Sequence, residues 1–474
     1  MSATPESQEK MVQHATPPAR SRRRLADRKA LVRVAVILTL AVGAAFLPIA
    51  GLTLAARVML GIFVLAAGLW VTETIPPFAT AILVVVSQIY LLGQKGGPLQ
   101  LEEGGESYEI FLNPLASPVL VLFFGGFILS LAAQKTKLDQ RLAKTFLTPF
   151  GTRPANLMLG VILVTGVFSM FMSNTATTLM MVAIVMPLFN SLDREDPFKK
   201  ALILSVPFAA NIGGLGTLIG SPPNAVAASV LGSMGHPVTF TQWMLFGFPL
   251  ALVLLFVLWL LMRLLFKPRH ARVELPELLL PPVDRNFIIV VGTFAATVGL
   301  WMLEPLHGIP SAVAALLPIM IFTMFGIIGA DDLKRIEWDV LILVAGGLSL
   351  GVGLDRSGLS DTLVGLIPFS AIDKTLLLAL FAVLTVLISN FMSNTSAANM
   401  LIPIVAAIPV FSPLEGPVTV ALCASLAMSL PISTPPNAIV YATRSIATAD
   451  MARTGSIVSV CGVGFLLACL LILF

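Results

Sequence analysis

The stretch FMSNTATT (171–178) has a counterpart far along the chain, FMSNTSAA (391–398), so the pentapeptide FMSNT occurs twice. Each copy lies in a long apolar stretch without a charged residue. Serine, asparagine and threonine are costly in lipid unless protein groups satisfy their hydrogen bonds. A polar motif that recurs in such surroundings therefore indicates a role in architecture or function.

The composition is typical of a membrane protein. Of 474 residues, 57% are hydrophobic and only 11% are charged, and the mean hydropathy is +0.94. Uncharged runs of about 20 residues, the length at which a helix crosses a bilayer, recur from Leu31 to Phe474. The sequence predicts an all-α, polytopic membrane protein.

About eleven membrane-spanning helices are expected. Their predicted ranges are 31–50, 54–72, 76–93, 116–133, 201–230, 241–266, 284–303, 310–328, 339–355, 417–442 and 454–474. Two further uncharged stretches, 154–192 and 375–414, are centred on the FMSNT copies. At about 40 residues each they are too long for one span, so each is expected to turn back.

Several function classes are disfavoured. No GxxxxGK[ST] phosphate loop occurs, so transport by this chain would be driven by a gradient rather than by ATP. The three cysteines lie in apolar segments and the four histidines are scattered, so we expect neither a thiol centre nor a metal centre built from these residues. We interpret the basic segment 20–29 as a cytoplasmic anchor, rather than a nucleic-acid site or an export signal.

Positive charge sorts by side if each turning stretch leaves and returns on one face. The predicted cytoplasmic segments then hold 25 of the 29 Lys and Arg residues, and the others are Arg57, Lys95, Arg356 and Lys374. The positive-inside rule supports this threading. It predicts a cytoplasmic N-terminus and an external C-terminus. The first turning stretch would open to the inside and the second to the outside.

An internal repeat extends beyond the pentapeptide. Three further landmarks recur in the same order: LFFGGFILSL (122–131) with ILVAGGLSLG (342–351), GSPPNAVA (220–227) with STPPNAIV (433–440), and Trp70 with Ile75-Pro76 matching Trp301 with Ile309-Pro310. With the opposite entry sides of the two turning stretches, this order predicts two inverted repeats, as in secondary transporters.

The motifs predict where helices begin. Serine is a good helix N-cap, so each SNT should mark the turn at which a second half-helix starts. In 221–224 and 434–437 a hydroxyl residue precedes Pro-Pro-Asn, which is a helix-start signature in the middle of a span. Each of these spans should be broken, and its free backbone groups would line a protein-enclosed cavity.

The paired SNT and S/T-PPN motifs resemble those of the divalent anion/sodium symporters, which carry dicarboxylates, citrate or sulfate. The resemblance covers the chain from Leu31 onward. It implies two re-entrant hairpins, an elevator mechanism and a homodimer in the inner (plasma) membrane. The implied scaffold is 31–150 and 284–371, and the implied transport domain is 151–270 and 372–474. A basic tail (1–30) and a linker (271–283) complete the chain.

The resemblance also implies site residues. One sodium ion would be held by Ser169, Ser173, Asn174 and the broken span at Gly220. A second would be held by Ser389, Ser393, Asn394 and Ser433. The substrate would contact residues of all four motifs: Asn174, Thr175, Ser221, Asn394, Thr395, Thr434 and Pro435. Hydroxyl, amide and carbonyl oxygens are ligands suited to a hard cation.

The expected substrate is a small dianion, most simply a C4-dicarboxylate. No Lys or Arg lies near these motifs in the sequence, so we expect half-helix N-termini and bound sodium to supply the positive charge. A sodium/sulfate symporter and a sodium-independent dicarboxylate exchanger are the alternatives. A membrane enzyme is less well supported, because no carboxylate, His or Cys cluster accompanies the motifs. A channel is also less well supported, because it would not need two hairpin tips approached from opposite sides. Nucleic acid is not an expected partner.

Overall fold

The computed structural model describes residues 28–49, 51–99, 108–193, 195–269, 272–273, 280–366 and 372–473. The predicted tail up to residue 27 and much of the predicted linker 271–283 lie outside these ranges. All elements within them are helices: α2 (Arg28–Ala45), α3 (Leu54–Thr72), α4 (Pro77–Leu91), η1 (Tyr108–Phe111), η2 (Asn113–Ala116), α5 (Pro118–Lys135), α6 (Leu138–Leu147), η3 (Thr148–Phe150), α7 (Pro154–Phe171), α8 (Asn174–Ser191), α9 (Phe198–Gly213), α10 (Pro222–Ser233), α11 (Phe240–Leu265), α12 (Arg285–Met302), α13 (Glu304–His307), α14 (Ser311–Ala314), α15 (Leu316–Met324), α16 (Ala330–Leu333), α17 (Trp338–Arg356), α18 (Leu359–Leu366), α19 (Lys374–Ser389), α20 (Asn394–Ala406), α21 (Glu415–Ser425), α22 (Pro435–Ala442) and α23 (Thr448–Leu473).

The all-helical prediction is confirmed for the described residues, and a helix or a broken pair of helices lies in every expected range. Within the described ranges, seven helices are long and apolar enough to cross a membrane: α3, α5, α7, α11, α12, α17 and α23. Shorter apolar helices lie at 77–91, 311–324 and 374–389. The amphipathic helices α6 and α18 were not expected, and each precedes one of the FMSNT hairpins.

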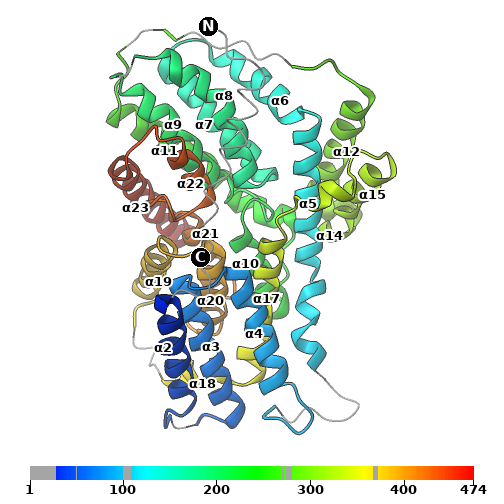
Figure 1. Ribbon diagram of the computed structural model, residues 1–474, viewed down its shortest axis with the longest axis vertical. Coiled ribbons are helices and arrows are strands. Elements are labelled where there is room, and N and C mark those ends of the chain that lie inside the picture. Colours follow the sequence, from blue (N-terminus) through cyan, green and yellow to red (C-terminus); the bar gives the residue numbers. More distant parts are fainter. Residues whose placement is uncertain are drawn as a thin grey trace.

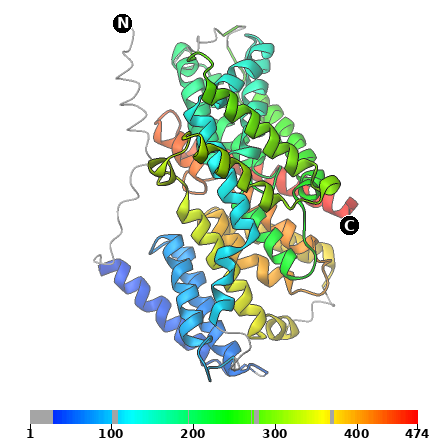
Figure 2. The ribbon, with the colours of Figure 1, turned by 90° about the vertical axis from the view of Figure 1, so that its right-hand side faces the viewer.

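The two turning stretches each form a pair of helices joined at the FMSNT motif. α7 ends at Phe171 and α8 begins at Asn174, while α19 ends at Ser389 and α20 begins at Asn394. Figure 1 places α7 and α8 toward the upper end of the molecule, and α19 and α20 lower down. Figure 2 shows the N-terminal helices, in dark blue, at the lower end.

Matched contacts show that the internal repeat is structural. The indole N–H of Trp70 donates to the carbonyl oxygen of Pro77 (3.1 Å), and that of Trp301 donates to Ser311 (2.9 Å). Tight glycine contacts are also paired. A Cβ at Gly125 would overlap Ala315, and one at Gly346 would overlap Ala81. α5 therefore packs on α15 as α17 packs on α4.

The two repeats interlock at the centre of the molecule. Both predicted breaks are present, since α9 gives way to α10 across residues 214–221 and α21 gives way to α22 across 426–434. α10 packs against α20 and α21 of the other repeat, and α22 packs against α8 and α9. Each half-helix that follows a break is thus held by the hairpin of the opposite repeat (Figure 1).

Polar contacts join loops that the charge pattern places on one side. Lys135 pairs with Asp332 (2.6 Å), and Lys200 pairs with Asp450 (3.0 Å). All four residues of these two ion pairs lie at predicted cytoplasmic positions. Which side of the membrane these loops face stays a prediction.

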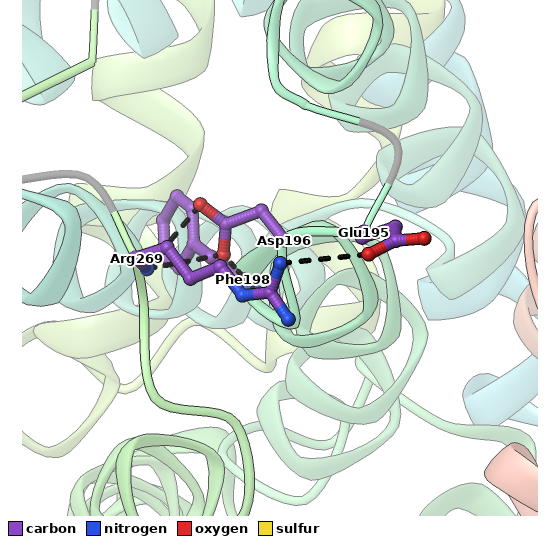
Figure 3. Close-up of polar contacts among 4 residues, drawn as sticks. All are labelled: Glu195, Asp196, Phe198 and Arg269. Atoms are coloured by element: carbon purple, nitrogen blue, oxygen red, sulfur yellow. Dashed lines mark hydrogen bonds and ion pairs between the residues drawn. The ribbon is translucent and has the colours of Figure 1, made fainter.

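A further set of polar contacts joins the start of α9 to the segment that follows α11 (Figure 3). Asp196 is buried and accepts hydrogen bonds from the backbone N–H groups of Phe198 (2.9 Å) and Arg269 (3.3 Å). The Arg269 guanidinium lies 3.7 Å from the Glu195 carboxylate. The Asp196 carboxylate therefore fixes the loop that follows the first hairpin.

Candidate functional site

Four half-helices begin at the motifs, as their sequences predict. Ser173 caps α8 and accepts from the Ala176 N–H (3.2 Å), and Ser393 caps α20 and accepts from the Ser396 N–H (3.1 Å). Thr434 caps α22 by accepting from the Asn437 N–H (3.3 Å). α10 begins at Pro222, after Ser221, without a side-chain cap.

The first cluster of polar groups forms around Asn174. Its amide contacts the buried Ser169 hydroxyl directly. The Asn174 amide atom that faces Ser169 lies 3.2 Å from the carbonyl oxygen of Gly220 and 3.1 Å from that of Ala210. If this atom is nitrogen, its two N–H groups can donate among the oxygens of Ser169, Gly220 and Ala210. If it is oxygen, four oxygens lie together, those of Asn174, Ser169, Gly220 and Ala210, and only the Ser169 hydroxyl has a proton to donate. Such an arrangement suits a hard cation.

The second cluster repeats the serine–asparagine contact. The buried Ser389 hydroxyl donates to Asn394 Oδ1 (2.8 Å) and lies 3.0 Å from the carbonyl oxygen of Ala424. Ala424 lies at the end of α21, as Ala210 lies at the end of α9. The structure thus brings together Ser169, Asn174 and Gly220 in one repeat, and Ser389 and Asn394 in the other.

Three of the predicted cation ligands have other partners. The Ser173 hydroxyl bonds to the Glu337 carboxylate (2.8 Å), and the Ser393 hydroxyl bonds to that of Ser396 (2.8 Å). The Ser433 hydroxyl bonds to Asn390 Oδ1 (3.0 Å). Their role as cation ligands stays a prediction.

Contacts across the two breaks were not foreseen. The side-chain nitrogen of Asn224 donates to the carbonyl oxygens of Gly214 and Thr217 (2.8 Å each). The side-chain nitrogen of Asn437 donates to the carbonyl oxygens of Met428 (2.9 Å) and Leu430 (3.0 Å). The asparagine of each PPN motif therefore binds the loop carbonyls that the break leaves free, which explains an amide at this place in both repeats.

The breaks of the two repeats also contact each other. The Asn211 amide nitrogen donates to the Thr434 hydroxyl (3.1 Å), and the Ser221 and Ser425 hydroxyls lie 2.8 Å apart. Asn211 and Ser425 lie near the ends of α9 and α21, in equivalent places. Sequence analysis missed Asn211, although an amide in the apolar run ALILSVPFAANIGG (201–214) was a usable signal.

A cavity of about 140 Å³ opens at the first hairpin tip. Ser173 and Thr175 line it from α8, and Arg335 and Glu337 line it from the segment before α17. The expectation that no basic residue lies near the motifs is therefore wrong for this tip, because Arg335 comes from a distant part of the chain. Ser130 and Gln134 of α5 add neutral polar groups.

The two clusters offer ligands of the kind that suits a hard cation rather than a soft transition metal. Among the described residues, no group of three or more His, Cys, Asp or Glu residues is placed to hold a metal ion. The clusters offer hydroxyl, amide and carbonyl oxygens, which are hard neutral ligands. Ser169, Asn174 and Gly220 would hold one ion, and Ser389 and Asn394 would contribute to a second.

Comparison with known proteins identifies transporters as the relatives of this chain. A citrate transporter family model (CitMHS) matches residues 67–419 and, again, 298–474. The first match begins three residues before Trp70 and the second begins three residues before Trp301. The matched family consists of transporters rather than enzymes.

Curated relatives are also transporters. The sodium-dependent dicarboxylate transporter SdcS of Staphylococcus saprophyticus is 31% identical over 442 residues, which cover 83% of this chain and 82% of the relative. SdcS of Staphylococcus aureus strain NCTC 8325 is 31% identical over 441 residues, with the same coverage. The uncharacterized transporter C3B8.04c of Schizosaccharomyces pombe is 32% identical over 397 residues, which cover 80% of this chain and 44% of that protein.

The fold is similar to that of the Alcanivorax borkumensis YdaH transporter, whose crystal structure is described as having an unusual topology. The TM-score is 0.60 at 15% identity, and the match covers 83% of this chain and 97% of the other. At this identity the likeness concerns the fold alone.

Proposed function

We propose, from the premise that the chain belongs to the divalent anion/sodium symporter family, that it couples sodium to the transport of a small dianion. The substrate class we infer is a C4-dicarboxylate. The observation that carries this proposal is the pair of equivalent clusters, Ser169 with Asn174 and Ser389 with Asn394, at the starts of α8 and α20.

The proposed chemistry uses partial charges and bound cations. Each half-helix N-terminus carries roughly half a positive charge. α8, α10, α20 and α22 each begin at a motif, and each presents backbone N–H groups and hydroxyls there. The proposed substrate contacts are Asn174, Thr175, Ser221, Asn394, Thr395, Thr434 and Pro435. Thr395, Ser221 and Thr434 are buried, so an anion that reaches them loses its water.

Sodium would offset this loss of hydration. A dianion in a buried site with partial charges alone is strongly disfavoured by desolvation. Sodium ions held at the two asparagine clusters add full positive charge beside the anion. Binding of the dianion and of sodium would therefore favour each other, which is the basis of coupling.

We also propose the division into a moving and a fixed part. The helices α7–α10 and α19–α22 interlock and carry all the motifs, which supports a transport domain of 151–270 and 372–474. The segments 31–150 and 284–371 would form the scaffold of a homodimer, against which this domain moves in an elevator motion. The N-terminus would be cytoplasmic and the C-terminus external.

Uptake of labelled succinate into proteoliposomes tests the proposal. Uptake that requires an inward sodium gradient supports the symporter. Uptake that requires internal dicarboxylate but no sodium would identify an exchanger. Sodium-driven uptake of labelled sulfate, with little uptake of succinate, would identify a sulfate carrier. Absence of uptake for every dianion, in protein that is folded and inserted, would contradict the proposal.

A further inference from the structure

The carboxylate of Glu337 occupies the first hairpin tip. The Ser173 hydroxyl donates to Glu337 Oε1 (2.8 Å) while its oxygen accepts from the Ala176 N–H (3.2 Å). One hydroxyl group therefore separates this carboxylate from the first turn of α8. The unpaired N–H groups of a helix attract negative charge at this end, and an arriving anion would seek the same groups.

The position of Glu337 is well defined by its neighbours. Ile336, on one side, is buried. Trp338, on the other side, donates its indole N–H to the carbonyl oxygen of Leu333 (2.9 Å) and packs on Phe124, with ring centroids 5.6 Å apart. The carboxylate is thus held at the tip by two anchored residues.

The internal repeat shows that this contact is particular to the first tip. At the second tip the Ser393 hydroxyl bonds to Ser396 (2.8 Å), whose counterpart in the first hairpin is Ala176. When Gly125 is matched with Gly346, Glu337 corresponds to Ala116, so the other repeat has a neutral residue at this place. The inverted architecture does not require a carboxylate here.

Among the described residues that line the cavity, Glu337 is the one carboxylate. Arg335 lines the same cavity, and Asp339 lies two residues further along the chain. On α5 the nearby Lys135 is paired with Asp332 (2.6 Å), and the lining residues of α8 are uncharged. An entering dianion would meet one cation, several neutral donors and one carboxylate.

We propose that Glu337 competes with the dianion for the first SNT tip and is displaced when the substrate binds. This inference rests on the proposed function. Two carboxylates a few ångströms apart at one helix N-terminus repel each other, so the Ser173–Glu337 bond and the bound substrate exclude each other. Glu337 thereby stabilises the empty transporter and sets the dianion concentration at which it fills.

Direct binding to the full-length purified protein tests this idea. In saturating sodium, Glu337→Gln should bind labelled succinate about tenfold more tightly than wild type, the change expected when one charge-assisted hydrogen bond no longer has to be broken. Glu337→Ala, which introduces the residue of the other repeat, should behave in the same way. Asp339→Asn, the matched control, should bind as wild type does.

A second measurement separates competition from a general structural effect. Succinamate carries one carboxylate instead of two, so it is repelled less by Glu337 and should gain less than succinate from Glu337→Gln. Equal gains for the two ligands would contradict competition. Unchanged or weaker succinate binding in both Glu337 variants would also overturn the inference. A rise in the sodium requirement with unchanged succinate affinity would assign Glu337 to the cation instead. If wild type binds no dianion at all, the proposed function fails, which is a different result.

Discussion

The Asn211 amide nitrogen lies 3.1 Å from the Thr434 hydroxyl, and the equivalent hydroxyls of Ser425 and Ser221 lie 2.8 Å apart. Each pair joins the end of one repeat's first half-helix to the start of the other repeat's second half-helix. The two helix N-termini at the breaks are therefore held in place by groups from the opposite repeat.

Asn211→Ala should destabilise the protein by about 1–3 kcal/mol, the cost of leaving buried polar groups without partners. The amide also lies 3.3 Å from Asn437 Oδ1, which would lose its donor. Thermal unfolding in detergent measures the effect, and succinate uptake should fall with it. Ser233→Ala, at an exposed hydroxyl, is the control and should change stability by less than about 0.5 kcal/mol. Equal stability of Asn211→Ala and wild type would contradict the role of this pair.

Asn174→Asp or Asn394→Asp should abolish dicarboxylate binding while sodium binding survives. The new charge would stand beside the anion, and two charges about 4 Å apart repel by roughly 4 kcal/mol at an effective dielectric constant of about 20. A carboxylate still offers oxygen ligands to sodium. Asn286→Asp, at an exposed site in α12, is the control. Retained dicarboxylate affinity with lost sodium binding would place the anion elsewhere.

Much of this architecture was predictable because it depends on local rules. The hydroxyl and proline signals gave the starts of α8, α10, α20 and α22, since N-caps and the first helical turn depend on adjacent residues. The repeated Trp and Gly-Gly landmarks predicted the internal repeat, because they recur in the same order in both halves. Each break was expected because proline cannot continue a helix from the preceding turn.

The missed features arise from tertiary contacts. Glu337 reaches Ser173 from a separate segment of the chain, and Arg335 joins it in the same cavity. No local pattern marks such a contact. The helices α6 and α18 were missed for another reason, because they are too short and too polar to read as membrane spans.

Side-specific labelling tests the predicted threading. Cysteine placed at His236, which is exposed, should react with an impermeant reagent in intact cells, in a background without the three natural cysteines. Cysteine at Glu195, where the side chain is 86% exposed, should react only after permeabilisation. Asp196 is unsuitable because it is buried and accepts two backbone hydrogen bonds. Labelling of the Glu195 position in intact cells would overturn the orientation.

The stability of the predicted cytoplasmic face should depend on Asp139 in α6. Burial raises the pKa of this carboxyl from 3.8 to about 6, although the Gln140 N–H and Lys137 lower it. The folded state therefore favours the protonated acid, so stability is full below about pH 4 and falls as the pH rises through 6. The loss is roughly 3 kcal/mol at 1.36 kcal/mol per pKa unit.

Asp139→Asn should remove this pH dependence. Melting temperatures between pH 4 and pH 8 provide the measurement, because the amide does not titrate. Asp331→Asn, at a side chain that is 95% exposed, should keep the wild-type profile. A decline in the Asp139→Asn variant as steep as in wild type would show that another group is responsible.

The central claim is that bound sodium, together with Arg335 at the first hairpin tip, supplies positive charge to a dianion site built mainly from neutral donors and helix N-termini. Equilibrium binding of labelled succinate to the purified protein, across a range of sodium concentrations with choline as the replacement cation, tests it most directly. The account predicts that succinate affinity rises steeply with sodium. It also predicts that Ser169→Ala and Ser389→Ala shift this rise to higher sodium concentrations. Succinate binding of equal affinity in sodium and in choline would contradict it.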